Sequence, residues 1–400
     1  MEVKNEYNAL IPEERVIKII HRFFEDEKKG DLDARKRAKE YLTKFLVKTG
    51  DGSFTLNSNE RHGKSETMHT HHGALKESME KFVKPAGLES KKEVHILDIC
   101  SGLGYNASSC IEYLKDAKKI NIDMVEISLE TLAIALLIEN PMKSYEIIKK
   151  SIEDKLYQEK IIGFRFNETI DERVNIGIFI EDARKIETKK KYDAIFLDAF
   201  SPAKCPELYS LEFFIKLKDL LDDNGVILTY TSAAPVRGAM VKAGLHVGEG
   251  PQFGRSGGTI ASKNLKNIKK SLSINDERMI ALSDAGIPFR DPELKDSFKR
   301  IIQRREEERL STRGFQKLAS TVKTPLYLFD DLEESRLKRR VLKNLNKLGI
   351  SDLKSKKAAF IVCPQFEECI CDCNKEMLNN SKDRINEMKK RLKMITVHIS

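Results

Sequence analysis

The sequence has no tryptophan and no apolar run that approaches the length of a membrane-spanning helix. Such a helix needs about 20 consecutive apolar residues, so we expect no association with a membrane. The first residues, Met1 to Glu6, are charged and lack the apolar core of a secretion signal. We therefore expect the seven cysteines to be reduced thiols and the protein to be cytoplasmic.

An excess of acidic residues is also absent, because 71 Lys and Arg stand against 62 Asp and Glu. The basic surplus lies in residues 265–400, which carry 30 basic and 20 acidic side chains, whereas residues 1–264 carry 41 and 42. A basic segment is typical of proteins that bind an anionic polymer such as a nucleic acid. A solvated surface of charged helices explains the same composition, and the sequence leaves both interpretations open.

Strand and helix patterns alternate along the middle of the chain. The apolar runs that are typical of buried strands lie at 94–98, 120–126, 174–180, 192–197 and 226–231. Their alternation with helical patterns predicts a doubly wound, Rossmann-like α/β fold with a parallel sheet.

Three parts of the chain are expected from this pattern. Residues 1–90 form N-terminal helices and a substrate-entrance segment, residues 91–264 the α/β domain, and residues 265–400 a charged, basic C-terminal extension. Within the extension, one apolar strand is expected at Ala358 to Cys363.

The most informative segment runs from Val94 to Tyr105, where an apolar run leads through Asp98 into a Ser-Gly-Leu-Gly turn. A buried strand, a glycine-rich turn and a helix N-terminus are how doubly wound sheets bind nucleotide-like ligands. The third glycine of the dinucleotide-binding pattern is missing, because Ala107 takes its place. We expect Asp98, Gly102 and Gly104 to contact a cofactor.

Carboxylates also end the next two strands. Glu126 closes the second strand, and Asp182 with Ala183 follows the third. Since the carboxyl ends of parallel strands meet at one edge, we expect Glu126 to bind ribose hydroxyls and Asp182 and Ala183 to lie beside an adenine ring. Each acid alone is better explained as a helix cap, but three in succession favour a ligand site.

The fourth strand ends in a loop that runs from Asp198 to Pro206 and contains two prolines. The prolines stiffen the loop and hold Asp198 in place. Such a carboxylate suits a nucleophilic amine, because it can orient the N–H groups and help to remove a proton during methyl transfer from a sulfonium. The alternative interpretation is a proline-rich connection whose aspartate caps a helix.

Several segments together resemble a known family. They are Asp51–Leu56, Thr67–His69 with Gly73–Ser78, Asp98–Gly104, Asp198–Pro206 and Phe253–Arg255. Occurring in this order over roughly residues 50–295, they resemble the MnmC-like tRNA methyltransferases, the S-adenosylmethionine-dependent half of the tRNA 5-methylaminomethyl-2-thiouridine biosynthesis protein.

This resemblance implies a seven-stranded methyltransferase fold, S-adenosylmethionine as cofactor, tRNA as partner and methylation of an aminomethyl group on the wobble uridine. It also implies that Asp198 is nearest the reacting amine and that Lys204 and Arg255 contact the substrate. The bifunctional members carry a flavin oxidase domain with its own Gly-x-Gly-x-x-Gly pattern, which this sequence lacks. A separate enzyme is then expected to supply the aminomethyl-uridine.

Two clusters of possible metal ligands occur outside this pattern. His69, with two neighbouring histidines, lacks a fixed acidic or cysteine partner, so we expect a lid or tRNA contact rather than a metal. Structural hydrogen bonding by these histidines explains the same pattern. Cys363, Cys369, Cys371 and Cys373 depart from the usual paired spacing. In an extended segment the last three are too far apart for one ion without a bend, and we expect no metal site.

Two other functions remain open. A polyamine aminopropyltransferase has the same fold and an aspartate-rich loop, but would want further carboxylates, and only Glu207 is near the Asp198 loop. A non-catalytic RNA-binding protein on a methyltransferase scaffold would not need intact Asp98, Glu126 and Asp198. Basic helical segments around residues 298–305 and 336–340 are expected to give electrostatic contact with an RNA backbone at most.

Overall fold

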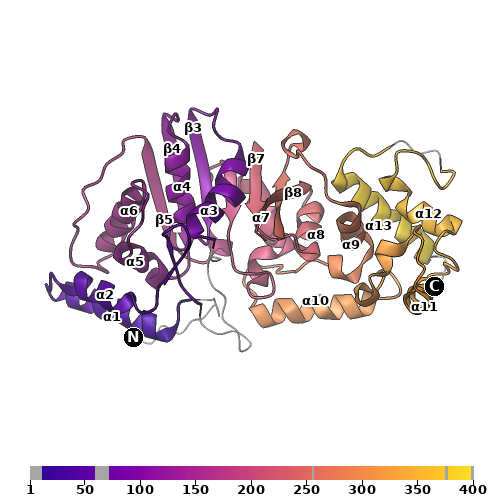
Figure 1. Ribbon diagram of the computed structural model, residues 1–400, viewed down its shortest axis with the longest axis horizontal. Helices are drawn as coiled ribbons and strands as arrows, with labels where there is room; N and C mark the ends of the chain where they lie inside the picture. The colour runs from indigo at the N-terminus through magenta and orange to yellow at the C-terminus, as the bar shows by residue number, and fades with distance from the viewer. Residues whose placement is uncertain (1–10, 59–71, 255, 374–376, 398–400) are drawn as a thin grey trace. The chain divides into compact units, whose positions relative to one another are not determined.

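The computed structural model describes residues 11–58, 72–254, 256–373 and 377–397 (Figure 1). The chain forms two compact units, one drawn from residues 1–208, 220–230 and 250–258 and the other from residues 209–219, 231–249 and 259–400. In the described ranges, no helix combines the length and apolar character that crossing a membrane requires. The three-part division expected from the sequence stays a prediction.

The strands are β1 Val47–Lys48, β2 Phe54–Thr55, β3 Glu93–Ile99, β4 Lys119–Glu126, β5 Val174–Ile180, β6 Tyr192–Leu197, β7 Leu221–Thr229, β8 His246–Phe253 and β9 Ser256–Ser262. The helices are α1 Glu14–Lys28, α2 Ala34–Leu42, α3 Ala74–Ser78, α4 Tyr105–Tyr113, α5 Leu129–Leu137, α6 Tyr145–Gln158, α7 Leu211–Leu220, α8 Ala234–Lys242, α9 Ile274–Leu282, α10 Phe298–Thr312, α11 Ser335–Asn346, α12 Lys356–Val362 and α13 Ser381–Val397.

One sheet has seven strands in the order β5-β4-β3-β6-β7-β9-β8. β3 pairs in parallel with β4 on one side and with β6 on the other. The chain therefore builds outward from β3 to β5 and then returns to β6 at β3's other edge. Doubly wound sheets bind their ligands at this reversal of strand order. The predicted fold class, a seven-stranded Rossmann-like methyltransferase fold, is confirmed.

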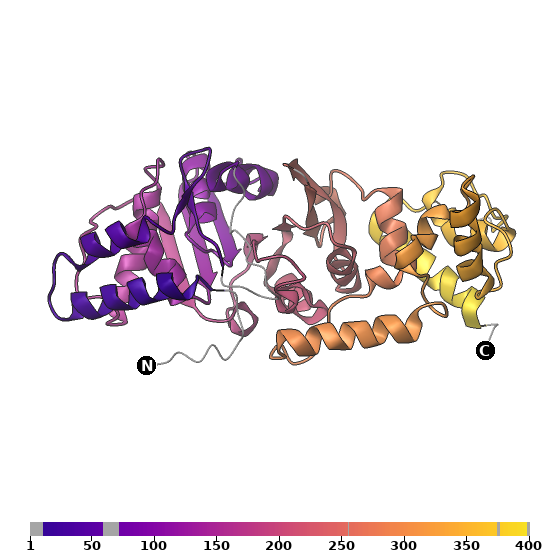
Figure 2. The same cartoon turned by 60° about the horizontal axis from the view of Figure 1, so that its bottom comes forward.

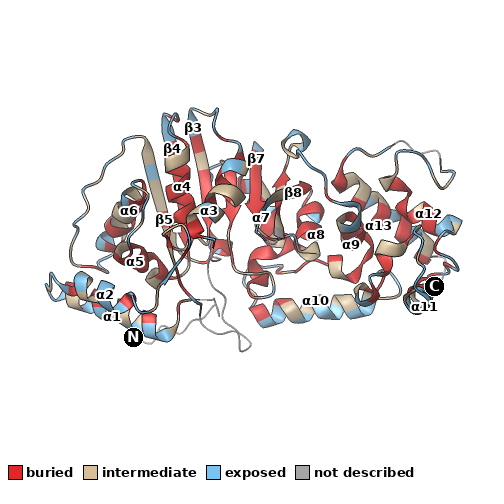
Figure 3. Ribbon diagram, in the orientation of Figure 1, coloured by how far each residue is buried: buried red, intermediate tan, exposed pale blue. Residues whose placement is uncertain are grey.

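The buried face of this sheet follows from its sequence. Val94, Ile96, Leu97 and Ile99 on β3 are fully buried, as expected for a central strand covered on both faces. β5 lies at the edge of the sheet and has mostly half-buried residues. Figure 3 shows the contrast between the buried β3 and the less buried β5. Helices α1 and α2 pack on α5, beside this part of the sheet (Figures 1 and 2).

The second unit contains most of the C-terminal helices, with α13 packed on α9 and α12. The expected strand at Ala358 to Cys363 is wrong, because this apolar run lies mainly in α12. The Ser355 side chain accepts a hydrogen bond from the Ala358 N–H and caps the helix. Ala358, Ala359, Ile361 and Val362 then face the interior at helical spacing. A short apolar run does not by itself distinguish a buried strand from a buried helix.

Candidate active site

Two aspartates meet where the strand order reverses. Asp98 is the last but one residue of β3, and Asp198 directly follows β6. The amide of Asn106, on the first turn of α4, connects them: its Nδ2 donates to Asp98 Oδ1 at 3.2 Å and to Asp198 Oδ2 at 3.1 Å. Asn106 has no signal in the sequence, because only the folded sheet brings β3, β6 and α4 together. The structure therefore brings Asp98 and Asp198 together and adds a third residue between them.

This pair of aspartates is unfavourably placed as long as both are charged. Burial, with a smaller contribution from the charges of Asp198 and Glu126, raises the pKa of Asp98 to about 8, against the opposing effect of the Asn106 amide. Burial likewise raises the pKa of Asp198 to about 6, against the opposing effects of the Asn106 amide and Lys81. Asp98 Oδ2 is buried and has no hydrogen-bond partner among the described residues. A buried polar atom without a partner costs about 1–3 kcal/mol, so this site favours a ligand that brings N–H donors or positive charge.

The glycine loop follows β3 with two left-handed glycines, Gly102 at φ 55° and Gly104 at φ 82°. Gly104 is required by packing, since a Cβ there would lie 2.6 Å from Ile148 Cγ2 on α6. Gly102 differs, because the nearest atom to a Cβ at that position would be the Cys100 carbonyl oxygen, 3.8 Å away. The space above Gly102 is thus open to a ligand, and Gly104 fixes the helix that follows.

Glu126 contacts this loop from the end of β4. Its Oε2 accepts a hydrogen bond from Gly102 N at 3.0 Å and its Oε1 one from Ser128 N at 2.9 Å. Burial raises the pKa of Glu126. Each carboxylate oxygen has a second lone pair, so Glu126 retains the capacity to accept hydroxyl hydrogens beside Gly102.

The carboxylate of Asp182 interacts with Arg184, two residues further along the chain. It precedes the short 3₁₀ turn Ala183–Lys185 and accepts a hydrogen bond from Arg184 N at 2.9 Å. Its carboxylate also pairs with the buried Arg184 guanidinium, with an Nη2–Oδ2 distance of 2.7 Å. Asp182 therefore shapes the turn that carries Ala183, and the cofactor contact expected for both residues stays a prediction.

Lys81 is a second residue that the sequence analysis did not identify. It lies in the π-helical turn Met79–Val83, a rare conformation that is frequent at functional sites. Its Nζ pairs with Glu77 at 3.1 Å and lies 5.8 Å and 5.9 Å from the ring centres of Tyr230 and Phe253. The positive charge of Lys81 lowers the pKa of Asp198, against the larger effect of burial. A cation held by two aromatic rings thus stands near Asp198.

The Asp51 carboxylate connects the turn at residues 51–53 with the start of α3. Asp51 accepts hydrogen bonds from Ser53 N and from Lys76 N, at 3.0 Å and 2.9 Å. A Cβ on Gly73, which has φ 113°, would lie 2.0 Å from Asp51 Cγ, so only glycine permits this approach. The Tyr105 hydroxyl of α4 in turn donates to Phe54 O at 2.7 Å. The segment resembling the MnmC-like family therefore connects α3 with the glycine-loop helix.

The residues expected to contact substrate are placed only in part. Lys204 lies in the Asp198 loop with its backbone N–H bonded to Ser201 O at 2.7 Å, and the residue is largely buried. His69 and Arg255 lie outside the described residues. Their neighbours are placed: the rings of His72 and Phe253 meet edge to face, with centres 5.8 Å apart.

The geometry and the comparisons with known proteins agree. A family model described as S-adenosyl-L-methionine-dependent methyltransferase matches residues 144–264. A seven-stranded sheet with acidic groups at its switch point and this match define the class: the protein is a methyltransferase that uses S-adenosylmethionine, as predicted.

Individual relatives narrow the class. The uncharacterized protein MJ0670 of Methanocaldococcus jannaschii is 37% identical over 307 residues, which cover 75% of this chain and 83% of the relative. The tRNA 5-methylaminomethyl-2-thiouridine biosynthesis bifunctional protein MnmC of Leptospira interrogans is 30% identical over 168 residues, or 40% of this chain. The crystal structure of MNMC2 from Aquifex aeolicus matches with a TM-score of 0.52 and 27% identity, covering 69% of this chain and 92% of that one.

The chain belongs to the MnmC-like methyltransferases. The matched region corresponds to 25% of the length of the bifunctional Leptospira protein.

Proposed function

We propose that the protein transfers a methyl group from S-adenosylmethionine to the 5-aminomethyl group of the wobble uridine, or 2-thiouridine, of tRNA in the cytoplasm. The name of the MnmC relatives supports the substrate. The buried aspartate pair at the switch point supports the chemistry, and it is the observation that carries the proposal. A separate enzyme supplies the aminomethyl-uridine.

The cofactor's contribution is an activated methyl group on a positively charged sulfur. Asp98 offers it a buried carboxylate whose Oδ2 has no partner among the described residues, which fits a cationic ligand with N–H donors. The open space above Gly102 fits close approach of the ligand to the backbone. We assign Asp98, Gly102, Gly104 and Glu126 to this site.

Asp182 and Ala183 extend the assignment to the end of β5, which neighbours β4 in the sheet. The pairing of Asp182 with Arg184 leaves the turn itself to contact the adenine ring. Their role is therefore to present a shaped backbone rather than a free carboxylate.

Asp198 is the proposed catalytic residue. Methyl transfer requires a neutral amine, and the nitrogen must lose a proton as the new N–C bond forms. With a pKa of about 6, Asp198 is mostly ionised at neutral pH and accepts an N–H hydrogen from the amine. Asn106 fixes the orientation of its Oδ2. Holding the amine in line with the methyl group can supply about 7–11 kcal/mol of the barrier.

Substrate contacts are proposed for three further residues. Lys204 belongs to the same loop as Asp198, and the resemblance to the family assigns it to the substrate. His69 and Arg255 complete the set on the resemblance to the family. Contacts of cations with phosphate position an RNA without reading its sequence.

The direct test uses S-adenosylmethionine labelled in the methyl group and tRNA that carries the unmethylated aminomethyl-uridine. We expect label in tRNA with the wild type, and at least a ~100-fold slower transfer with Asp198→Ala, within the range for loss of a general base. The matched control is Asp193→Asn, which changes an aspartate at the opposite end of the same strand, where it pairs with Lys91.

Other results would replace the proposal. Binding of tRNA without transfer by the wild type would identify a non-catalytic RNA-binding protein. Transfer of an aminopropyl group to putrescine from the decarboxylated cofactor would identify a polyamine aminopropyltransferase.

A further inference from the structure

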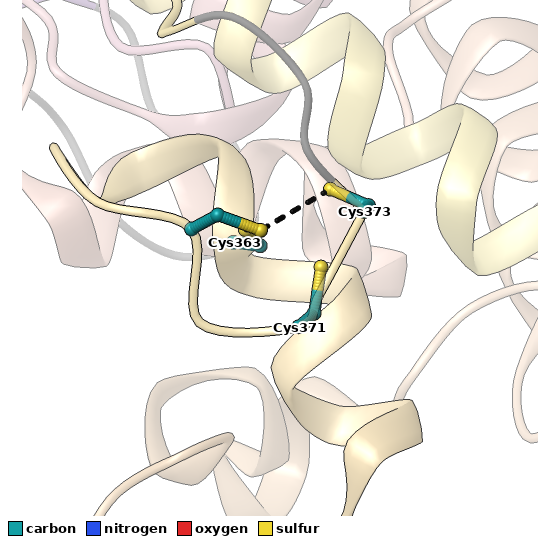
Figure 4. Close-up of side chains that lie close together, drawn as sticks. Cys363, Cys371 and Cys373 are labelled. Atoms are coloured by element: carbon teal, nitrogen blue, oxygen red, sulfur yellow. Dashed lines mark hydrogen bonds between the residues drawn. The ribbon is translucent and has the colours of Figure 1, made fainter.

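Four cysteines converge in the C-terminal part of the chain. The Sγ atoms of Cys363, Cys369, Cys371 and Cys373 all lie within 4.8 Å of one another. Cys363 opens the 3₁₀ turn that follows α12, and the other three lie on the loop after that turn. Figure 4 shows Cys363, Cys371 and Cys373 with their thiol groups directed toward a common centre.

The path of the loop explains why the sequence analysis did not expect this cluster. An extended segment would spread Cys369, Cys371 and Cys373 along one side at strand spacing. Instead the chain bends from residue 366 onward, and Asp372 adopts the left-handed conformation with φ 62°. This turn at Asp372 brings Cys371 and Cys373 back to the same centre as Cys363.

The spacing of the sulfurs fits one tetrahedral ion. A zinc–thiolate bond of about 2.3 Å places the four sulfurs of a tetrahedron about 3.8 Å apart. The Sγ–Sγ distances are 3.9 Å for Cys363 with Cys369 and 3.7 Å for Cys369 with Cys373. A cubane iron–sulfur cluster binds each thiolate through a different iron and therefore needs sulfurs farther apart. None of these four cysteines forms a disulfide.

A buried arginine contacts the cysteine cluster. Arg391 of α13 is 2% exposed, and its Nη1 and Nη2 lie 3.8 Å and 3.5 Å from the sulfurs of Cys371 and Cys373. Glu387 and the Phe360 carbonyl hold the guanidinium in this orientation, at 2.9 Å and 2.8 Å. Four thiolates around a divalent ion leave a net negative charge, and N–H donors beside the sulfurs stabilise such a charge.

We propose that these four cysteines bind one zinc ion, with Arg391 as the positively charged group beside it. Four protein ligands leave no open position, so the site is structural and not catalytic. It joins the end of α12 to the loop that precedes α13. A cavity of about 310 Å³ borders Cys363, Cys369 and Cys373, and Cys369 is exposed to solvent. This proposal is independent of the proposed methyl transfer.

The experiment measures metal in the full-length protein after purification and dialysis against a weak chelator. We expect one zinc per chain in the wild type and in Cys110→Ala, which changes a buried cysteine of α4. Cys371→Ser and Cys373→Ser are expected to lose zinc. Cobalt added to the metal-free protein should give the thiolate-to-metal and visible bands of a tetrahedral cobalt–sulfur site at one equivalent.

Arg391→Met separates the binding of the ion from folding. It keeps most of the side chain's volume and all four ligands, so we expect zinc to stay bound at one equivalent but with at least ~10-fold weaker affinity, as for loss of a group that supports metal ligands. Iron in place of zinc, with or without sulfide, would overturn the assignment. So would a wild type that binds neither zinc nor cobalt, or a Cys371→Ser variant that retains the metal.

Discussion

Asn106 is the residue on which the two aspartates of the site depend. Its amide donates to both carboxylates and so lowers the pKa of each, although burial has the larger effect. Proton acceptance by Asp198 requires the ionised form, so the rate of methyl transfer should rise with pH through about 6.

Replacing Asn106 by Ala should therefore move the acidic limb of the rate profile to higher pH, because the pKa of Asp198 rises when the amide is lost. The measurement is kcat/KM against pH for the wild type, Asn106→Ala and the control Asn121→Ala on β4. An acidic limb that stays in place in Asn106→Ala would argue against the coupling of these two residues.

Asp98 links the site to stability. Its folded-state pKa of about 8 lies above its ordinary value of 3.8, so the folded protein binds this proton more tightly than the unfolded chain. The resulting stabilisation is fully present below about pH 4 and is lost as pH rises through about 8.

The side chain of Asn does not ionise, so Asp98→Asn should not lose stability as pH rises. In the absence of cofactor the variant should therefore become more stable than the wild type with rising pH. The difference in unfolding free energy should reach on the order of 5 kcal/mol at pH 8 and shrink toward pH 4. Urea unfolding at several pH values measures it. Cofactor affinity should fall in the same variant. If the unfolding free energy of the wild type rose relative to that of Asp98→Asn with rising pH, this would contradict the buried, unpartnered state of Asp98.

At the scale of elements, the turn between β3 and α4 contains two glycines with different roles: Gly104 permits close packing, and Gly102 leaves space for a ligand. Gly104→Ala brings a methyl group to 2.6 Å from Ile148 Cγ2 at a left-handed φ of 82°. We expect a loss of about 2–4 kcal/mol of stability from this overpacking and backbone strain.

Gly102→Ala is the matched variant, because it has the same sign of φ but meets only one atom, at 3.8 Å. Gly102→Ala should lower the unfolding free energy by about 1–2 kcal/mol because of backbone strain. Relative to that loss of stability, it should weaken S-adenosylmethionine binding more than Gly104→Ala does. Urea unfolding and calorimetric cofactor titration on both variants test the contrast. Equal effects of the two substitutions on affinity would show that the cofactor does not approach Gly102.

Local patterns determine the elements of this chain better than the contacts between them. The bounds of β5 and β6 match the predicted strands because each is an apolar run bounded by polar residues. The same signal failed at α12, where a run of similar length is helical. Asn106 and Lys81 could not be identified, because α4 and the π-helical turn approach Asp198 only in the folded state. The cysteine loop was missed since its bend at Asp372 has no strong sequence signal.

At the scale of the whole molecule, the basic surplus of the C-terminal region is divided between structure and surface. Arg305 of α10 donates to the carbonyls of Ile287 and Ala285, so it supports the fold of its own unit. Arg336, Lys338 and Arg340 of α11 are exposed. The exposed cations of α11 are therefore available to an RNA backbone, whereas Arg305 of α10 is used within the fold.

Replacing Arg336, Lys338 and Arg340 together by Gln should weaken tRNA binding at low salt. If all three contact phosphates, the slope of log affinity against log salt should fall by about 2. Binding titrations at several salt concentrations measure this slope. The control neutralises the exposed Lys115, Lys118 and Lys119 at the opposite end of β4 from Glu126. An unchanged slope in the α11 variant, or an equal change in the control, would leave the basic surplus as a solvated surface.

The most direct measurement of the central claim is the identity of the methylated nucleoside. The protein is incubated with S-adenosylmethionine and tRNA that carries 5-aminomethyl-uridine or its 2-thio form, and the tRNA is then digested and analysed by mass spectrometry. With the wild type, the aminomethyl nucleoside should gain one methyl group on its exocyclic nitrogen, and with Asp198→Asn it should persist unchanged. A methyl group on any other atom of the tRNA, or equal conversion by Asp198→Asn, would contradict the account.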